Sequence, residues 1–271
     1  MLFENINWNL SGKRKLFAEK EAFIVSIPKS GRTWLRVLLN NYYCAALDSN
    51  EKLNSRDQHT DGRPAYFFTH DRYEHQTIAS KWQQITGRYL IPPACRNRQV
   101  LVLSRDPRDV MVSLYFQNTK REKESRRFRG NIGEMLDDPL LGVDRVITVM
   151  NSWMTEWGDR DSGFLLARYE DWQADPSHHF ARVIRFLGGP SLDSEALRIA
   201  IEQSQFDRMQ AMERAGVDGP RAIKPGDVND PESYKARRGK VGGYSDYLSN
   251  AQIARIESAM ERLDARFGYS E

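Results

Sequence analysis

The chain has few cysteines and no long apolar segment. Its 271 residues include only two cysteines, Cys44 and Cys95, which lack the spacing of metal ligands. Two isolated thiols in a chain of this length argue against a disulfide framework and favour a reducing compartment. No stretch approaches the length of a membrane span, and residues 1–20 have no apolar core of the signal-peptide kind. We therefore predict a cytoplasmic protein without stable membrane insertion.

The chain also lacks a strong excess of charge of one sign. It has 40 basic and 37 acidic residues, a formal net charge of +3. This balance argues against general nucleic-acid binding, although local basic clusters can still bind anions. One such cluster, residues 120–129, holds six basic and two acidic residues. It is interpreted either as an exposed helix end or as the rim of a site for an anionic acceptor.

Short apolar strands alternate with helical patterns along the chain. Strands are expected at 22–27, 66–69, 99–104 and 163–167, and the third is apolar throughout, as in a strand buried on both faces. Helices are expected at 33–42, 106–115, 143–157, 177–187, 194–203, 206–214 and 251–267. This alternation predicts an α/β fold with a central parallel sheet flanked by helices, in a single domain spanning residues 1–271. Residues 215–248 show no periodicity.

The segment that follows the first expected strand is suited to anion binding. Pro28-Lys-Ser-Gly-Arg-Thr-Trp34 joins a strand to a helix, so the N–H groups of the first helical turn are available to a ligand. Gly31 permits close approach of the backbone, and Lys29 adds a positive charge. The pattern GxxxxGK[ST] of a Walker A loop occurs nowhere in the chain. A tight turn with a surface lysine remains the alternative interpretation.

A second anion site is expected after the third strand. Arg105 follows that strand directly, and Ser113 lies eight residues later in the next helix. Ligands bind at the carboxyl ends of parallel strands, and arginine is suited to bidentate contact with phosphate. The alternative for Arg105 is a structural ion pair with Asp106 or Asp109. Two anion sites on one sheet edge would suit a nucleoside with phosphates at both ends.

Five segments, in order along the chain, resemble segments of sulfotransferases that use 3′-phosphoadenosine 5′-phosphosulfate (PAPS). Pro28–Trp34 is similar to the 5′-phosphosulfate loop, and Ser104-Arg-Asp-Pro-Arg-Asp-Val-Met-Val-Ser113 to the 3′-phosphate motif. Arg237-Arg-Gly-Lys-Val-Gly242 resembles the C-terminal RxGxxG-type motif of that family. Arg168-Tyr-Glu-Asp171 and Ser204-Gln-Phe-Asp-Arg-Met209 resemble two segments that line the adenine.

The resemblance implies a P-loop-like fold, PAPS as co-substrate and no metal. It assigns residues to three parts of the donor, the desulfated form of which is 3′-phosphoadenosine 5′-phosphate (PAP). The 5′-phosphosulfate would be held by Lys29, Ser30, Gly31, Arg32 and Thr33, and the 3′-phosphate by Arg105, Ser113, Arg237, Arg238 and Gly239. The adenine would be lined by Trp34, Tyr169, Ser204, Phe206 and Met209. Ordinary core packing is the alternative for Trp34, Phe206 and Met209.

By the same resemblance, His70 at the end of the second strand is the expected catalytic base, with Lys29 as the second catalytic residue. An attacking hydroxyl must lose a proton, and histidine accepts protons near neutral pH. His75 and Glu74 are the rival bases.

The sequence departs from the family pattern at several positions. Arg32 stands where threonine is usual, and Phe68 stands two residues before His70, where many cytosolic members have lysine. The C-terminal motif ends in Gly243-Tyr244 rather than aspartate-tryptophan, and the family's short dimerisation motif is not recognisable. These departures leave the acceptor and the oligomeric state open.

The sequence thus predicts sulfuryl transfer from PAPS to a hydroxyl or amine by direct in-line attack. The acceptor would be a small molecule, a lipid or a glycan. Two other functions stay open: a nucleotide-dependent kinase, and a non-catalytic nucleotide- or glycan-binding module on the same fold.

Overall fold

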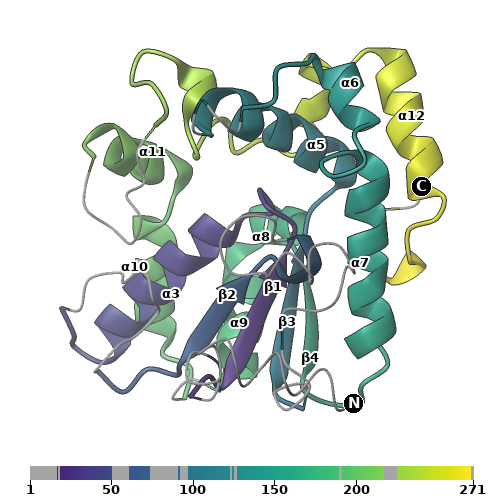
Figure 1. Cartoon of the computed structure of the whole chain (residues 1–271). Coiled ribbons are helices and arrows are strands. Elements are labelled where there is room, and N and C mark those ends of the chain that lie inside the picture. Colours follow the sequence, from purple (N-terminus) through teal and green to yellow (C-terminus); the bar gives the residue numbers. More distant parts are fainter. Residues whose placement is uncertain are drawn as a thin grey trace.

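A parallel sheet of four strands forms the centre of the molecule (Figure 1). The computed structural model of the chain describes Phe17, Ile91, Glu124 and residues 19–50, 61–73, 97–122, 127–188, 191–216 and 225–269. The strands are β1 (Ala22–Ser26), β2 (Tyr66–Thr69), β3 (Gln99–Ser104) and β4 (Phe164–Arg168), in the spatial order β2-β1-β3-β4. All pairings are parallel, so the predicted central parallel sheet is confirmed.

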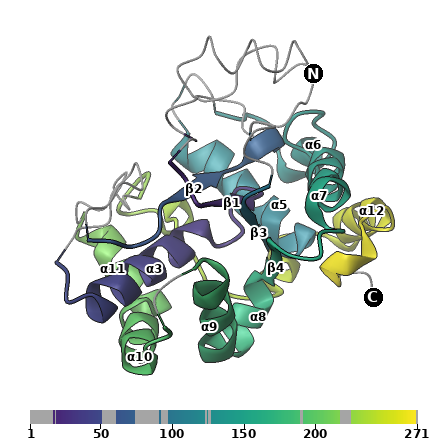
Figure 2. The same ribbon diagram turned by 90° about the horizontal axis from the view of Figure 1, so that it is seen from below.

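Helices cover both faces of this sheet (Figure 2). One face carries α3 (Arg32–Ala46), α8 (Tyr169–Ala174), α9 (Pro176–Phe186) and α10 (Ser194–Gln203). The other carries α5 (Pro107–Phe116), α6 (Ile132–Leu136), α7 (Val143–Trp157) and α12 (Asn250–Met260). Helix α11 (Phe206–Arg214) lies beside α3, where Met209 packs against Val37.

The alternation of side chains along each strand separates two hydrophobic cores. In β1, Phe23 and Val25 belong to the core beneath α5 and α7, whereas Ile24 belongs to the core beneath α3 and α9. In β3, Val102 belongs to the core beneath α5 and α7, and Leu103 belongs to the core beneath α3 and α9. Because successive strand side chains point to opposite faces, a strand covered on both faces must be apolar at every position.

The strand register brings the functional segments to one edge of the sheet. Val25 pairs with Thr69, Ser26 with Leu103, and Ser104 with Arg168, so the four strands end nearly level. The residues that follow these ends therefore share the carboxyl edge of the sheet, where ligands of α/β proteins bind.

Three features differ from the sequence expectation. The closing helix ends at Met260 rather than near Phe267, and a separate 3₁₀ turn, η7 (Ala265–Phe267), follows it. Asp264 separates the two elements: its backbone is not helical, and its side chain caps the new turn by accepting from Arg266 N. Helices α6 and α8 were not expected, since helices of five and six residues are too short to show periodicity. Helix α5 continues into a π-helical turn, η3 (Gln117–Arg121).

Candidate active site

A cavity of about 600 Å³ lies at the carboxyl edge of the sheet. Its wall comes from the loop after β1, the start of α3, the ends of β2 and β3, and helices α5, α8 and α11. The C-terminal segment 235–243 completes the wall. The predicted residues that line it are Lys29, Gly31, Arg32, Thr33, Trp34, His70, Arg105, Ser113, Tyr169, Ser204, Phe206, Met209, Arg237, Arg238 and Gly239. Ser30 is the remaining predicted residue; it is buried and is not part of the wall.

The loop after β1 has two residues with positive φ, Lys29 at 76° and Gly31 at 93°, with Ser30 between them. The Ser30 N–H donates to the Ile27 carbonyl at 3.4 Å. We call residues 29–31 the nest, because turns of this kind can bind anions. A Cβ at position 31 would lie 2.7 Å from the Tyr169 ring, so both the backbone angle and the space require glycine. No side chain caps the start of α3, which leaves its first N–H groups directed at the same place.

Lys29 is surrounded by other cations. Burial, followed by the nearby charges of Arg121 and Lys235, lowers the pKa of Lys29 to about 7. Glu213 opposes this shift only in part, and Arg105 adds to it. A bound anion would reverse the repulsion and keep Lys29 protonated.

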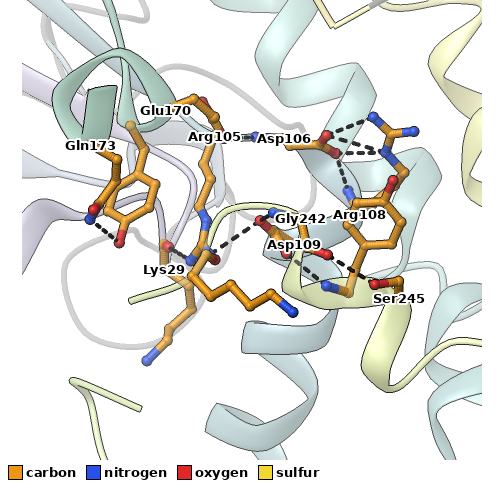
Figure 3. Close-up of polar contacts among 12 residues, drawn as sticks. Lys29, Arg105, Asp106, Arg108, Asp109, Glu170, Gln173, Gly242 and Ser245 are labelled. Atoms are coloured by element: carbon orange, nitrogen blue, oxygen red, sulfur yellow. Dashed lines mark hydrogen bonds and ion pairs between the residues drawn. The ribbon is translucent and has the colours of Figure 1, made fainter. Parts of the chain in front are cut away.

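Arg105 lines the cavity beside the loop after β1, where it donates to the Lys29 carbonyl at 3.4 Å, and it also makes an ion pair (Figure 3). Its guanidinium lies 3.3 Å from the Asp109 carboxylate, donates to the Lys240 carbonyl at 3.1 Å and stacks over the Tyr169 ring at 4.5 Å. Asp106, the other candidate partner, pairs with Arg108 at 2.7 Å instead. Arg105 therefore makes a structural ion pair and also lies on the cavity wall, so the two interpretations of this residue are compatible.

Asp109 joins the C-terminal motif to helix α5. Its two carboxylate oxygens accept from the backbone N–H groups of Gly242 and Tyr244, each at 2.9 Å (Figure 3). The side chain is buried, so the two bonds form away from competing water. Sequence reasoning had placed Asp109 only as a possible partner of Arg105. Its role as a link was missed because the partner N–H groups lie more than 130 residues later.

Glu170 and Tyr269 stabilise the turn after β3 by hydrogen bonds. Glu170 accepts from the Asp106 N–H at 2.9 Å and from the Tyr269 hydroxyl at 2.8 Å. The Tyr269 hydroxyl also lies 3.1 Å from the Ser104 hydroxyl. Burial raises the pKa of Glu170. The extreme C-terminal part of the described chain therefore supports the turn that carries Arg105.

The C-terminal basic residues are held by nearby acids and rings. Arg237 pairs with Glu232 at 2.7 Å and stacks over the Phe116 ring at 4.6 Å. Arg238 pairs with Asp246 at 2.8 Å. Gly239 has φ 63°, and a Cβ there would lie 2.6 Å from the Phe206 ring. The glycine of this motif is therefore required by its contact with Phe206.

The aromatic and small residues expected beside the adenine also have structural contacts. Trp34 meets the rings of Tyr169 and Phe180 edge-on, at centroid distances of 5.7 and 5.2 Å. The Ser204 hydroxyl accepts from the Asn41 amide at 3.1 Å. These residues both pack against the protein and line the cavity, so the two interpretations are compatible.

His70 directly follows β2 and lies on the cavity wall. Its Nδ1 is 2.7 Å from the Ser26 carbonyl oxygen. Because a carbonyl can only accept, Nδ1 carries the hydrogen, and the lone pair of the neutral ring is on Nε2. Burial, followed by the charges of Arg32 and Arg36, holds the pKa of His70 well below its ordinary value. The ring is therefore neutral at pH 7 and able to accept a proton. The rival bases, His75 and Glu74, lie outside the described residues.

Arg36 was not expected at the site. It lies one helical turn after Arg32 on α3, lines the cavity and stacks over the Phe68 ring at 4.3 Å. Phe68 is the position where the sequence lacks the lysine of many cytosolic sulfotransferases, so α3 supplies a positive charge next to that position. The i, i+4 spacing of the two arginines was the signal that could have identified Arg36.

Glu213 was also missed. It is fully buried, accepts from the Lys235 and Ala236 N–H groups at 2.7 and 2.9 Å, and pairs with Arg121 at 3.3 Å. It therefore ties the segment before the C-terminal motif to helix α11 and to η3. Of the sequence 215–248, which showed no periodicity, residues 215–216 and 225–248 are described. The second part carries two 3₁₀ turns, η5 (Pro231–Ser233) and η6 (Gly243–Asp246).

The basic segment 120–129 divides into an inner and an outer part. Arg121 turns inward to Glu213, whereas Arg127 and Arg129 are exposed and pair with Glu124. Neither Arg127 nor Arg129 lines the cavity. The outer part thus has the contacts of a solvated surface; Lys123, Ser125 and Arg126 lie outside the described residues.

Comparison with known proteins indicates the same family as the five sequence segments. The family model described as "Sulfotransferase domain" matches residues 19–268. The chain belongs to the sulfotransferase family. This sulfotransferase is 23% identical to cytosolic sulfotransferase 17 of Arabidopsis thaliana, over 88% of the chain and 72% of that protein. It is 24% identical to flavonol 3-sulfotransferase of Flaveria bidentis, over 90% of the chain and 82% of that protein.

Solved structures of sulfotransferases share its fold. A mouse sulfotransferase complexed with PAP superposes with a TM-score of 0.60 at 18% identity, covering 95% of this chain and 89% of its own. A retinol dehydratase in complex with androsterone and PAP gives a TM-score of 0.57 at 16% identity, covering 91% and 82%. Among the described residues, no helix is long and apolar enough to cross a membrane, and no group of three or more His, Cys, Asp or Glu could hold a metal ion.

The link made by Asp109 can be tested by its removal. Asp109→Ala leaves two N–H groups without acceptors, so we expect the free energy of unfolding to fall by about 2–5 kcal/mol. Chemical denaturation measures this change, and amide exchange at Gly242 and Tyr244 should accelerate. The exposed Asp161→Ala is the control and should change stability by less than about 0.5 kcal/mol. Equal stability of the two variants would show that the link contributes nothing.

The low pKa of Lys29 predicts unusual reactivity at neutral pH. Below pH 7 the amine is protonated and inert, and above pH 7 it is neutral and nucleophilic. Acetylation followed by mass spectrometry should therefore show a midpoint near pH 7 for Lys29. Free Nα-acetyl-lysine, labelled in parallel, should still be rising at pH 9 because its pKa is about 10.4. A Lys29 profile that follows the reference amine would contradict the shift.

Proposed function

We propose that this sulfotransferase transfers a sulfuryl group from PAPS to a hydroxyl or amine of a small-molecule acceptor by direct in-line attack. The observation that carries the proposal is one cavity whose wall holds two neighbouring anion sites and a neutral histidine. The first site is the nest around Lys29 and Gly31, and the second is the group formed by Arg105 and Arg237.

The residues present fit the donor. Two buried polar atoms near these sites, Ser30 Oγ and Arg105 Nε, have no hydrogen-bond partner among the described residues, and phosphate oxygens would satisfy such groups. The same cavity wall also includes Trp34, Phe206 and Met209, which suit a flat aromatic base. We therefore assign the 5′-phosphosulfate to the nest, the 3′-phosphate to the Arg105 site and the adenine to the aromatic wall, with the ribose that carries both phosphates between the two anion sites.

The chemistry assigned to the chain is proton transfer and charge stabilisation. The donor supplies a sulfuryl group attached to a phosphate leaving group. His70 Nε2 accepts the proton of the attacking hydroxyl, while the hydrogen bond from Nδ1 to the Ser26 carbonyl holds the ring in place. Lys29 and the N–H groups of the nest stabilise the negative charge that develops on the leaving phosphate. Positioning and charge therefore dominate, as in phosphoryl transfer.

The two other functions are less well supported. A kinase would need the phosphate-binding lysine of a Walker A loop, and the chain contains no such motif. A non-catalytic binding module would not need both His70 and Lys29 on the wall of the cavity. We further propose a cytoplasmic location, supported by the two isolated cysteines and by the similarity to cytosolic sulfotransferase 17. A small-molecule acceptor is supported by the similarity to a flavonol 3-sulfotransferase.

The proposed 3′-phosphate site predicts nucleotide selectivity. Arg105→Ala should weaken PAP binding by roughly ten- to a hundredfold, because a hydrogen bond to a charged group is lost. Binding of AMP, which has no 3′-phosphate, should change much less. Calorimetric titration of both nucleotides measures the difference. Equal weakening would restrict Arg105 to its ion pair with Asp109.

The proposed base predicts a loss of turnover without a loss of donor binding. His70→Ala should lower kcat by about 10²–10⁴-fold, the usual contribution of a general base, and leave the PAP dissociation constant nearly unchanged. Release of PAP from PAPS in the presence of an acceptor panel measures the rate. His178→Ala, at an exposed position on α9 away from the cavity wall, is the control. A near wild-type rate in the His70 variant would reassign the role to His75 or Glu74.

A further inference from the structure

The residue that follows His70 combines two unfavourable features. Asp71 has φ 45°, and only two other non-glycine residues of the described chain, Lys29 and Asp48, share a positive φ. Its carboxyl group is buried as well, since the residue is 1% exposed. A positive φ costs conformational energy, and a buried carboxylate is costly unless hydrogen bonds compensate it. Unfavourable conformations of this kind cluster at functional sites and persist only where the surrounding structure holds them.

Two N–H donors from distant segments hold the Asp71 carboxylate. The indole N–H of Trp153 on α7 donates to one oxygen at 3.1 Å, and the Ile91 backbone N–H donates to the other at 3.3 Å. Trp153 and Ile91 are also buried, so the two bonds form away from competing water. The Asp71 side chain is therefore anchored to the hydrophobic core that contains α7.

The backbone around Asp71 forms a tight corner at the end of β2. The Asp71 N–H donates to the Thr69 hydroxyl at 2.8 Å, and the Tyr73 N–H donates to the His70 carbonyl at 2.9 Å. The 3₁₀ turn η1 (Asp71–Tyr73) begins at this corner. His70 and Tyr73 line the cavity, whereas Asp71 is not part of its wall. At this corner the Asp71 side chain thus enters the core, while its neighbours reach the cavity.

The proposed role of His70 depends on the place of this corner. The Nδ1 atom lies 2.7 Å from the Ser26 carbonyl oxygen, which leaves the lone pair of the neutral ring on Nε2. This bond joins the residue after β2 to the end of β1, so it requires the backbone at position 70 to keep its place. If that backbone moved, the ring would lose its acceptor and the hydrogen could exchange between the two nitrogens.

We propose that Asp71 is a positioning residue of the sulfuryl transfer, whose anchored carboxylate holds the corner that presents His70 Nε2 to the acceptor proton. The inference rests on the proposed function, because it assumes that His70 is the base. Asp71 itself lies outside the cavity wall and takes no proton in the reaction. It acts through the backbone that it shares with His70, so its loss should reduce turnover and leave donor binding unchanged.

Kinetics of Asp71 variants test the proposal. Asp71→Ala should lower kcat by roughly ten- to a hundredfold, because a small misplacement of a catalytic group can cost that much, while the dissociation constant of PAP stays unchanged. Asp71→Asn keeps one acceptor oxygen and tolerates a positive φ, so it should restore most of the lost kcat. Release of PAP from PAPS with an acceptor panel measures the rates.

A double variant shows whether Asp71 acts through His70. In the His70→Ala background, Asp71→Ala should cause no further loss of kcat, because a positioning residue contributes only through the group that it positions. A residue that merely stabilised the fold would lower kcat to the same extent in both backgrounds.

The ring nitrogens of His70 give a readout that needs no turnover. In protein labelled with ¹⁵N-histidine, the His70 signals are assigned by their absence from the His70→Ala spectrum. The wild type should show one protonated and one unprotonated ring nitrogen. Asp71→Ala should show shifts averaged between the two tautomers. A loss of stability alone would not produce this averaging.

Trp153→Phe tests the same link and leaves Asp71 in place. It removes the indole N–H, so kcat should fall and the His70 nitrogens should average, both less than in Asp71→Ala. Trp157→Phe makes the same change at a fully buried position one turn later on α7, and is the control for lost core packing. It should leave kcat and the His70 signals unaltered. This pair of variants decides the question if Asp71→Ala does not fold.

Three results would overturn the inference and leave the proposed function intact. The first is a wild-type kcat with unaveraged His70 nitrogens in Asp71→Ala. The second is an equal loss of kcat from Asp71→Ala with and without His70. The third is the same kcat and the same His70 signals in Trp153→Phe and Trp157→Phe. A near wild-type rate in His70→Ala would instead remove His70 as the base, and this inference with it.

Discussion

The carboxylate of Asp109 is the group on which the C-terminal wall of the cavity depends. It lies four residues after Arg105 on α5, and it binds at the same time to that arginine and to the N–H groups of Gly242 and Tyr244. One buried group thus fixes a cation that lines the cavity and the chain segment that forms its far wall. Glu213 does the same for residues 235–236 and Arg121. Two buried carboxylates therefore hold the basic segments that have no strand or helix of their own to position them.

The same arrangement concentrates positive charge where the sheet strands end. Lys29 and Lys235 both have lowered pKa values, and in each case burial is the first cause and a neighbouring cation the second. Such a cavity is unfavourable for the protein alone and favourable for a polyanion. The stability of the fold comes from elsewhere, namely the two apolar cores on either side of the sheet, so the site can retain this repulsion. Binding of an anionic ligand is the event that relieves it.

Much of the fold could be predicted from the sequence, because the patterns that indicate strands, turns and helices are local. The strands at Tyr66–Thr69 and Gln99–Ser104 and the helix at Val143–Trp157 coincide with the predicted ranges. Local patterns also identified the loop around Gly31, the turn at Arg105 and the position of His70 after a strand. These came from residue type and from the change between strand-like and helical periodicity. Helices α6 and α8 escaped because they are too short for periodicity, and the closing helix was overextended across Asp264.

The amino-acid sequence by itself determined the order of strands and helices, the apolar strand faces, and the glycines at positions where φ is positive. It also fixed the motifs that indicated the sulfotransferase family. Only the tertiary structure decided which side chains meet: Asp109 with Gly242, Glu213 with Lys235, and Arg36 with the ring of Phe68. These pairs are separated by 22 to 133 residues. Periodicity acts over a few residues, whereas such contacts exist only once parallel strands have brought distant segments to one edge of the sheet.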